Sequence, residues 1–219
     1  MSRRDQRRPL RSPRRIILVL CEGDTESAYF TYLRRTFGER SIKYEIISLE
    51  GSKLLSDLPN KLAQRDWEII ENAWLVLDTE GQRRQREQRL QRVLRRYQKI
   101  KVCWSDPSIE RWFLLHFTES NAPFSNAQEV IQRLKNYCAD YDKDVKSIGL
   151  FLSSLYHSPL CLKTCLRCAI ERAQRLEAAA QAIGDPPPTQ IHRLIQAIFP
   201  AVQPVAGEDC RKVCRDRRC

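Results

Sequence analysis

Short apolar runs alternate with amphipathic stretches through the first half of the chain. Four runs, most of them with a fully apolar interior, predict strands over 15–20, 44–49, 73–77 and 101–104. Between them, apolar residues recur at helical spacing and predict helices over 24–37, 54–65 and 83–99. Buried strands that alternate with helices are typical of a parallel sheet covered on both faces. We therefore expect an α/β fold with a parallel sheet of about four strands flanked by helices.

The second half of the chain is predicted to be helical. Helical spacing of apolar residues extends over 126–138, 145–156, 163–183 and 189–199. Pro186, Pro187 and Pro188 mark a sharp helix boundary, since proline cannot continue a helix. We divide the chain into a basic arm (1–14), an α/β core (15–117), a helical C-terminal part of the same domain (118–200) and a Cys-rich tail (201–219).

Acidic residues follow three of the predicted strands. Glu22 comes after the first strand, Asp78 and Glu80 after the third, and Asp106 after the fourth. In an open parallel sheet the carboxyl ends of the strands share one edge, where reactive groups gather. We expect these acids to meet there, with Glu26 one helical turn beyond Glu22.

Clustered carboxylates repel each other unless a cation lies among them. Mg²⁺ prefers carboxylate oxygens and water, and an open magnesium site suits phosphoryl transfer or phosphodiester cleavage. The same acids could instead cap helices or pair with surface arginines, which are abundant in this chain. Spacing alone leaves both interpretations open.

Composition adds a preference for polyanions. The formal net charge is +11 and the pI about 9.4, which favours encounters with nucleic acid. Arg83, Arg84, Arg86 and Arg89 begin a strongly basic predicted helix that could hold a phosphate backbone, although such a helix is also often a solvated surface. No apolar run approaches the roughly 18 residues of a membrane helix, so we expect a soluble, cytoplasmic protein without membrane contact.

Nine cysteines are present, and we interpret them as reduced thiols. Cys161, Cys165 and Cys168 form one cluster, and a second one lies in the tail. Such spacings could hold Zn²⁺, but the positions i, i+4 and i+7 also suit small residues that line a helical core. Both interpretations remain open.

Several segments, taken in order, resemble a known family. They are CEGDTESAYF (from Cys21), LVLDTEG (from Leu75), DPSIERWFLLHF (from Asp106), the Tyr141 to Lys143 triplet and PPTQIHRLI (from Pro187). The first two are similar to the acidic motifs of Toprim domains. The succession resembles the RloB-like family of prokaryotic defence proteins, and the resemblance extends from about Arg15 to Phe199.

This resemblance implies a Toprim-like fold and a metal-dependent nuclease, often encoded beside an ATPase partner in anti-phage systems. By position, Glu22 matches a glutamate that manages protons and touches the metal, and Asp78 and Glu80 match the acidic pair that binds Mg²⁺. Glu80 departs from the usual Asp, which alters its reach. Glu26 and Glu110 match further acids of the family motifs, and Lys143 matches the lysine of a Tyr-x-Lys motif.

The prediction from sequence is a Mg²⁺- or Mn²⁺-dependent nuclease that acts on DNA or RNA in phage defence. In it, Glu22, Glu26 and Lys143 are catalytic, and Glu22, Asp78, Glu80 and Glu110 bind the metal. Glu110 could equally be a plain acid at a helix N-terminus, and Lys143 a solvated lysine. Two alternatives are a non-catalytic subunit that binds nucleic acid or an ATPase, and a hydrolase of small nucleotides. The oligomeric state, a homo-oligomer included, is left open.

Overall fold

Four parallel strands form the centre of the protein. The computed structural model describes residues 15–49, 54–143, 148–149, 151–152 and 159–202. The strands are β1 (Arg15–Cys21), β2 (Ile42–Ser48), β3 (Ile70–Asp78) and β4 (Ile100–Ser105). They lie in the order β2-β1-β3-β4, and every pair is parallel. The predicted α/β class and the number of strands are confirmed.

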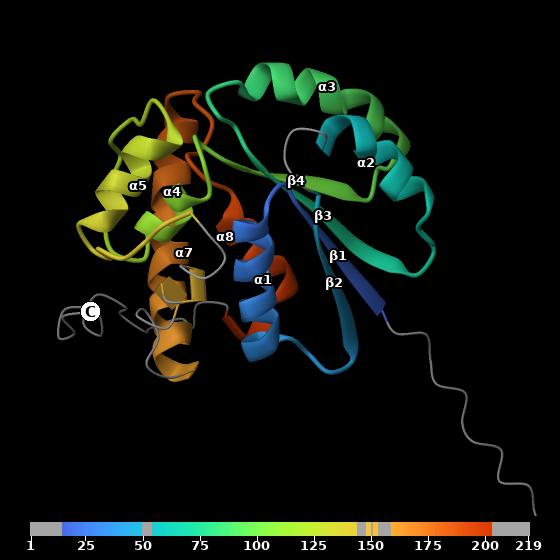
Figure 1. Cartoon of the computed structure of the whole chain (residues 1–219), viewed down its shortest axis with the longest axis horizontal. Coiled ribbons are helices and arrows are strands. Elements are labelled where there is room, and N and C mark those ends of the chain that lie inside the picture. Colours follow the sequence, from blue (N-terminus) through green and yellow to red (C-terminus); the bar gives the residue numbers. More distant parts are fainter. Residues whose placement is uncertain (1–14, 50–53, 144–147, 150, 153–158, 203–219) are drawn as a thin grey trace, which may run out of the picture.

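Side chains of β1 alternate between two hydrophobic cores. Ile17, Val19 and Cys21 point to one face of the sheet, and Ile16, Leu18 and Leu20 to the other. Helices α2 (Leu54–Ala63) and α3 (Arg83–Arg96) cover the second face. Helix α1 (Asp24–Phe37) and the C-terminal helices cover the first (Figure 1). Burial on both faces is the reason that β1 is almost wholly apolar, whereas the edge strand β2 is only half-buried and carries Lys43 and Glu45.

Helix α1 begins immediately after β1. Gly23 is its N-cap in extended conformation, and the Gly23 backbone N donates to Oε2 of Glu26 over 3.1 Å. One face of the helix then buries Tyr29, Phe30 and Leu33 against the sheet. The turn that carries Glu22 is therefore fixed between a central strand and a docked helix.

The C-terminal helices pack on the same face of the sheet as α1. They are α4 (Glu110–Leu114), α5 (Ala127–Lys135), α7 (Pro159–Ala182) and α8 (Ile191–Ile198), followed by the short 3-10 helix η2 (Pro200–Val202). Trp112, Phe113 and Ile195 from these helices join the core under α1. The predicted helix over 145–156 falls largely outside the described residues, as do the basic arm and the Cys-rich tail.

Helix α7 ends before the three prolines, and the chain then returns along β4. Thr189 forms an antiparallel bridge with Ser105. The backbone N of Asp106 donates to the carbonyl of Pro188, and that of Gln190 to the carbonyl of Trp104, both over 2.8 Å. This contact fixes the carboxyl end of β4. Within the described ranges, no helix has the length and apolar character needed to cross a bilayer.

Candidate functional site: an acidic centre at the switch point of the sheet

The chain changes direction across the sheet beside β1. Its first connection leads from β1 to β2 on one side, and β3 then returns to the other side of β1. Ligand sites of open α/β sheets lie beyond the carboxyl ends of the strands at such a switch point. Glu22 and Asp78 lie there, and Oε2 of Glu22 accepts a hydrogen bond from the backbone N of Asp78 over 3.1 Å. The structure thus brings together two acids that are 56 positions apart in the chain.

Glu110 and Lys143 complete this group from the helical part. The Lys143 Nζ lies 3.7 Å from Oδ2 of Asp78 and 3.9 Å from Oε1 of Glu110. The hydroxyl of Tyr141 donates to the same Glu110 oxygen over 3.0 Å. We call Glu22, Glu26, Asp78, Glu110 and Lys143 the acidic centre.

Two oxygens of the acidic centre are buried without a partner. Among the described residues, nothing donates a hydrogen bond to Oδ1 of Asp78 or to Oε2 of Glu110, although both atoms are inaccessible to solvent. A buried carboxylate oxygen that accepts no hydrogen bond is costly, so each such atom indicates a missing partner. Their chemistry suits a hard cation.

The acidic centre is nevertheless not a closed metal cage. Over the described part of the chain, no three Asp, Glu, His or Cys residues are grouped closely enough to hold an ion between them. Mg²⁺ does not require such a cage, because it is usually bound by one or two carboxylates, several waters and substrate phosphates. Asp78 and Glu110 offer two carboxylates with one unused oxygen each, which fits that mode.

Burial and mutual repulsion shape the charges of the acidic centre. Burial raises the pKa of Asp78 well above its ordinary value, and the carboxylates of Glu26 and Glu110 raise it further, against the opposing effect of Lys143. Burial likewise raises the pKa of Glu26, although its backbone hydrogen bond and Lys143 counteract it. For Lys143, burial alone would lower the pKa, but the carboxylates of Glu110, Asp78 and Glu26 outweigh it and the pKa is raised. Lys143 therefore acts as the positive charge that lets the acids coexist.

Arg86 was predicted to bind nucleic acid, but it pairs with Glu22, in line with the alternative that strand-end acids pair with arginines. Its two guanidinium nitrogens bind the two oxygens of Glu22, and one of them also donates to the carbonyl of Asp78. Both side chains of the ion pair are only 13% exposed. The sequence did contain a sign of this ion pair. Helix α3 has no acid in its first turn and carries Arg83, Arg84 and Arg86 there, where the helix dipole favours negative charge. Cations placed there indicate a nearby carboxylate.

Glu80, predicted as a metal ligand, does not join the acidic centre directly. It has a φ of 48°, in the left-handed region, and its side chain is 66% exposed. Its Oε2 lies 3.9 Å from Arg86. Asp106 lies at the same edge of the sheet, but its carboxylate accepts a hydrogen bond from the hydroxyl of Thr79 and so ties the β3 loop to the β4 loop.

The four arginines predicted to bind nucleic acid fall into two pairs. Arg83 binds Glu87 over 2.8 Å and lies over the ring of Trp104, and Arg86 is held by Glu22. Arg84 and Arg89 are exposed on the outer surface of α3. Only this second pair is available in the structure for a phosphate backbone.

The predicted zinc cluster lies at the start of α7. Cys165 and Cys168 are buried, and Cys165 packs in the core beneath α1, as expected for a thiol that lines a core. The side chain of Cys161 falls outside the described residues. Zinc at this run stays a prediction, which a measurement of metal content would test.

The fold and the site define a class of protein: an α/β protein with a parallel four-stranded sheet and a buried group of carboxylates at its switch point. Residues 17–198 match the family model described as RloB-like protein, and the chain belongs to this RloB-like family. No curated protein and no solved structure matches the chain.

Proposed function

We propose that this protein is a metal-dependent nuclease that hydrolyses phosphodiester bonds at the acidic centre. One observation carries the proposal: at the switch point of a parallel sheet, Asp78 and Glu110 each contact the Lys143 amino group with one oxygen. The other oxygen of each is buried and has no hydrogen-bond partner among the described residues. Sites that stabilise a phosphoryl group combine cations with groups that manage protons. The acidic centre contains both kinds of group.

Asp78 and Glu110 would hold Mg²⁺ or Mn²⁺ through their unused oxygens. Such an ion, when bound, supplies Lewis-acid stabilisation to the non-bridging oxygens of a phosphodiester. Lys143 would donate to one of these oxygens, because its amino group already lies among the acids and keeps its positive charge. Tyr141 fixes the orientation of Glu110 through its hydrogen bond.

Glu22 and Glu26 would divide the handling of protons. Arg86 fixes both oxygens of Glu22, yet a carboxylate has about four acceptor positions and Oε1 has room for a further donor. Glu22 would accept a proton from the attacking water at that position. Glu26 is buried with a raised pKa, so it retains a proton to higher pH than an exposed glutamate and suits the leaving oxygen.

Nucleic acid is the substrate class that the charge of the chain supports. The net charge is +11, and Arg84 and Arg89 are exposed on the helix whose first turn carries Arg86 into the acidic centre. A backbone held on α3 would therefore pass the acidic centre. Salt-sensitive binding with little sequence preference follows from contacts of this type.

The test is cleavage of labelled single-stranded RNA, single-stranded DNA and duplexes by the full chain, with Mg²⁺, with Mn²⁺ and with EDTA. We expect cleavage only with a divalent cation. Asp78→Asn and Glu110→Gln should lose it by at least about a hundredfold, the typical effect of removing one group that stabilises a transition state. Glu68→Gln, an exposed acid outside the centre, is the matched control. Circular dichroism would establish that each variant is folded.

Other outcomes separate the rival functions. Cleavage that persists in EDTA or in both variants would refute the proposal. Tight binding of polynucleotide without cleavage would favour a non-catalytic subunit. Hydrolysis of nucleoside triphosphates without cleavage of polynucleotide would favour a small-nucleotide hydrolase. The anti-phage role and the ATPase partner are part of the proposal through the family alone, and loss of phage resistance in cells carrying Asp78→Asn would test that role.

A further inference from the structure

The two edge strands of the sheet, β2 and β4, differ in how the chain covers them. Along β4, Thr189 bridges Ser105, and the backbone N of Gln190 donates to the carbonyl of Trp104 over 2.8 Å. Strand β2 pairs with β1 on its inner side. Over the described part of the chain, no other strand pairs with the outer side of β2. Its outward backbone groups can therefore pair with a strand of another molecule.

Strand β2 lacks most of the features that protect an edge strand from such pairing. Its seven residues keep one register with β1 from Ile42 to Ser48, without the irregularity that β1 shows with β3. It contains no proline, and its isoleucines are only half-buried. Proline, bulges and short length commonly protect natural edge strands, and so do charges, especially lysine. Lys43 is such a charge, but Glu45 offers the opposite sign two positions away.

Side chains of β2 alternate between the two faces of the sheet. Ile42, Tyr44 and Ile46 contact the core on the α1 side. Lys43 and Glu45 therefore point to the α2 side, where Nζ of Lys43 lies 2.6 Å from Oε1 of Glu45. Their side chains are 54% and 20% exposed, so both charges can be reached from outside the chain. The outer side of β2 thus presents apolar groups on one face and a pair of opposite charges on the other.

Charge selects one register for a pair of β2 strands. In an antiparallel pair related by a two-fold axis normal to the sheet, opposite residues point to the same face, so the axis passes through one residue. An axis at Lys43 opposes two lysines, and an axis at Glu45 opposes two glutamates, which is destabilising. An axis at Tyr44 is the only one that sets Lys43 opposite Glu45 of the second copy. It also sets Ile42 opposite Ile46, so apolar side chains meet on the other face.

We propose that β2 forms a dimer interface with β2 of a second copy of this chain, antiparallel about a two-fold axis at Tyr44. The two sheets then form one continuous sheet, and each Glu45 lies between the Lys43 of its own chain and that of the second copy. The strands of the two copies run in opposite directions, which places the two acidic centres at opposite ends of the strands in the joined sheet. Each acidic centre is built from one chain, so this inference does not depend on the proposed function.

Sedimentation velocity of the full chain over a range of protein concentrations tests the inference. We expect a reversible equilibrium between monomer and dimer for the wild-type protein. Lys43→Glu places glutamates opposite each other on both sides of the axis and should raise the dissociation constant by at least about tenfold, because each changed pair occurs twice. Raised salt should narrow this difference, because it screens exposed charges. Lys61→Glu, the same charge change at an exposed lysine of α2, is the matched control and should dimerise like wild type.

A mixture of two variants tests the register. Glu45→Lys opposes lysines and should stay monomeric on its own. Mixed with Lys43→Glu, it restores opposite charges on both sides of the axis, so the mixture should form a heterodimer although neither variant associates with itself. Glu45 also binds Arg65, so urea denaturation must first establish that Glu45→Lys is folded. Lys43→Glu, at an exposed residue, keeps the test decisive if Glu45→Lys does not fold.

Hydrogen–deuterium exchange gives a second readout that needs no variant. A wild-type peptide containing β2 should exchange more slowly at high protein concentration than at low, because its outward amides become hydrogen-bonded in the dimer. A peptide from the central strand β3 is the control and should exchange equally at both concentrations. The inference would be overturned by a protein that stays monomeric at every concentration, by a dimer that persists in Lys43→Glu, or by a mixture of folded variants that stays monomeric.

Discussion

Replacement of Lys143 by methionine tests the electrostatics of the acidic centre directly. Methionine keeps an unbranched apolar side chain of similar length and removes the charge. The substitution leaves Asp78 and Glu110 without the cation that lies 3.7 Å and 3.9 Å from their oxygens. We expect the protein to lose stability at neutral pH.

The magnitude follows from these two contacts. At about 4 Å, a pair of unit charges interacts with about 1 kcal/mol in bulk water and about 4 kcal/mol near a protein surface. The Lys143 side chain is 43% exposed, so solvent screens its charge and the net effect is well below the sum of two such terms. We expect Lys143→Met to lower the free energy of unfolding by about 2 kcal/mol at pH 7. For a chain of this size, that corresponds to a fall in Tm of about 4 to 8 °C.

The loss should depend on pH in a defined direction. Burial raises the pKa of Asp78 and of Glu26 in the folded state, so the folded protein binds more protons than the unfolded chain above the ordinary carboxyl pKa of about 4. Stability therefore falls as pH rises from that value through the raised pKa values. Without Lys143 both pKa values rise further, and the difference between variant and wild type widens with pH. It should be smallest near pH 4 and grow as the pH rises toward 7.

Urea denaturation in EDTA, followed by circular dichroism from pH 4 to pH 8, measures this difference. Lys61→Met, an exposed lysine on α2, is the control and should show no such pH dependence. Added Mg²⁺ should reduce the deficit of Lys143→Met, because a bound cation stabilises the folded state and replaces the lost charge. Equal stability of Lys143→Met and wild type at pH 7, or a deficit that is the same at pH 4, would refute the reasoning.

Three further substitutions have expected outcomes. Arg86→Gln leaves the nearly buried carboxylate of Glu22 without its bidentate partner and should lower the unfolding free energy by about 3 kcal/mol, measured by urea denaturation. Arg86→Lys should recover only part of this loss. A neutral effect of Arg86→Gln would contradict the pairing. Tyr141→Phe removes the donor to Glu110 and should cost about 1 to 3 kcal/mol, whereas an unchanged urea midpoint would show that solvent replaces the bond. Arg84→Gln with Arg89→Gln should reduce the slope of log affinity against log salt for a single strand by about 1.4, and an unchanged slope would exclude α3 as the phosphate surface.

The sequence predicted the sheet and half of the acidic centre for one physical reason. A strand buried on both faces is a continuous apolar run, and a parallel sheet collects the residues after such runs at one edge. Glu22 and Asp78 could therefore be placed together from the sequence pattern. Glu80 has the same position relative to β3, but its left-handed backbone turns it toward solvent. Single-residue conformation in a turn is not encoded in periodicity.

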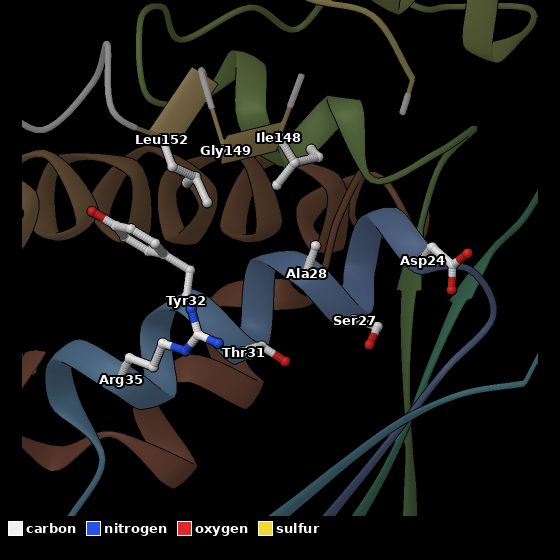
Figure 2. A pocket seen from close by; sticks show the side chains of 9 residues that line it. All are labelled: Asp24, Ser27, Ala28, Thr31, Tyr32, Arg35, Ile148, Gly149 and Leu152. Carbon is white, nitrogen blue, oxygen red and sulfur yellow. The ribbon is translucent and has the colours of Figure 1, made fainter. Parts of the chain in front are cut away.

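The other half of the acidic centre depends on packing between layers. Glu110 and Lys143 were assigned only by family resemblance, because their approach to Asp78 requires α4 and the 141–143 segment to dock on the α1 side of the sheet. Arg86 arrives from the opposite side, and its partner is 64 positions away. A groove along α1 also depends on such docking, because Ile148, Gly149 and Leu152 form one of its walls (Figure 2). Contacts between distant segments carry no local pattern that would predict them.

The two cations of the site differ in what could replace them. Arg86 binds both oxygens of Glu22 and the carbonyl of Asp78, so a spherical ion in its place would leave part of this geometry unfilled. Lys143 makes only two longer ionic contacts, and each of its acids keeps a second, unused oxygen. A divalent cation therefore gains most on the Lys143 side, where it neutralises two carboxylates without breaking a hydrogen bond. The Arg86 side is the fixed half of the site, and the Lys143 side is the half that can accept an ion and a phosphate.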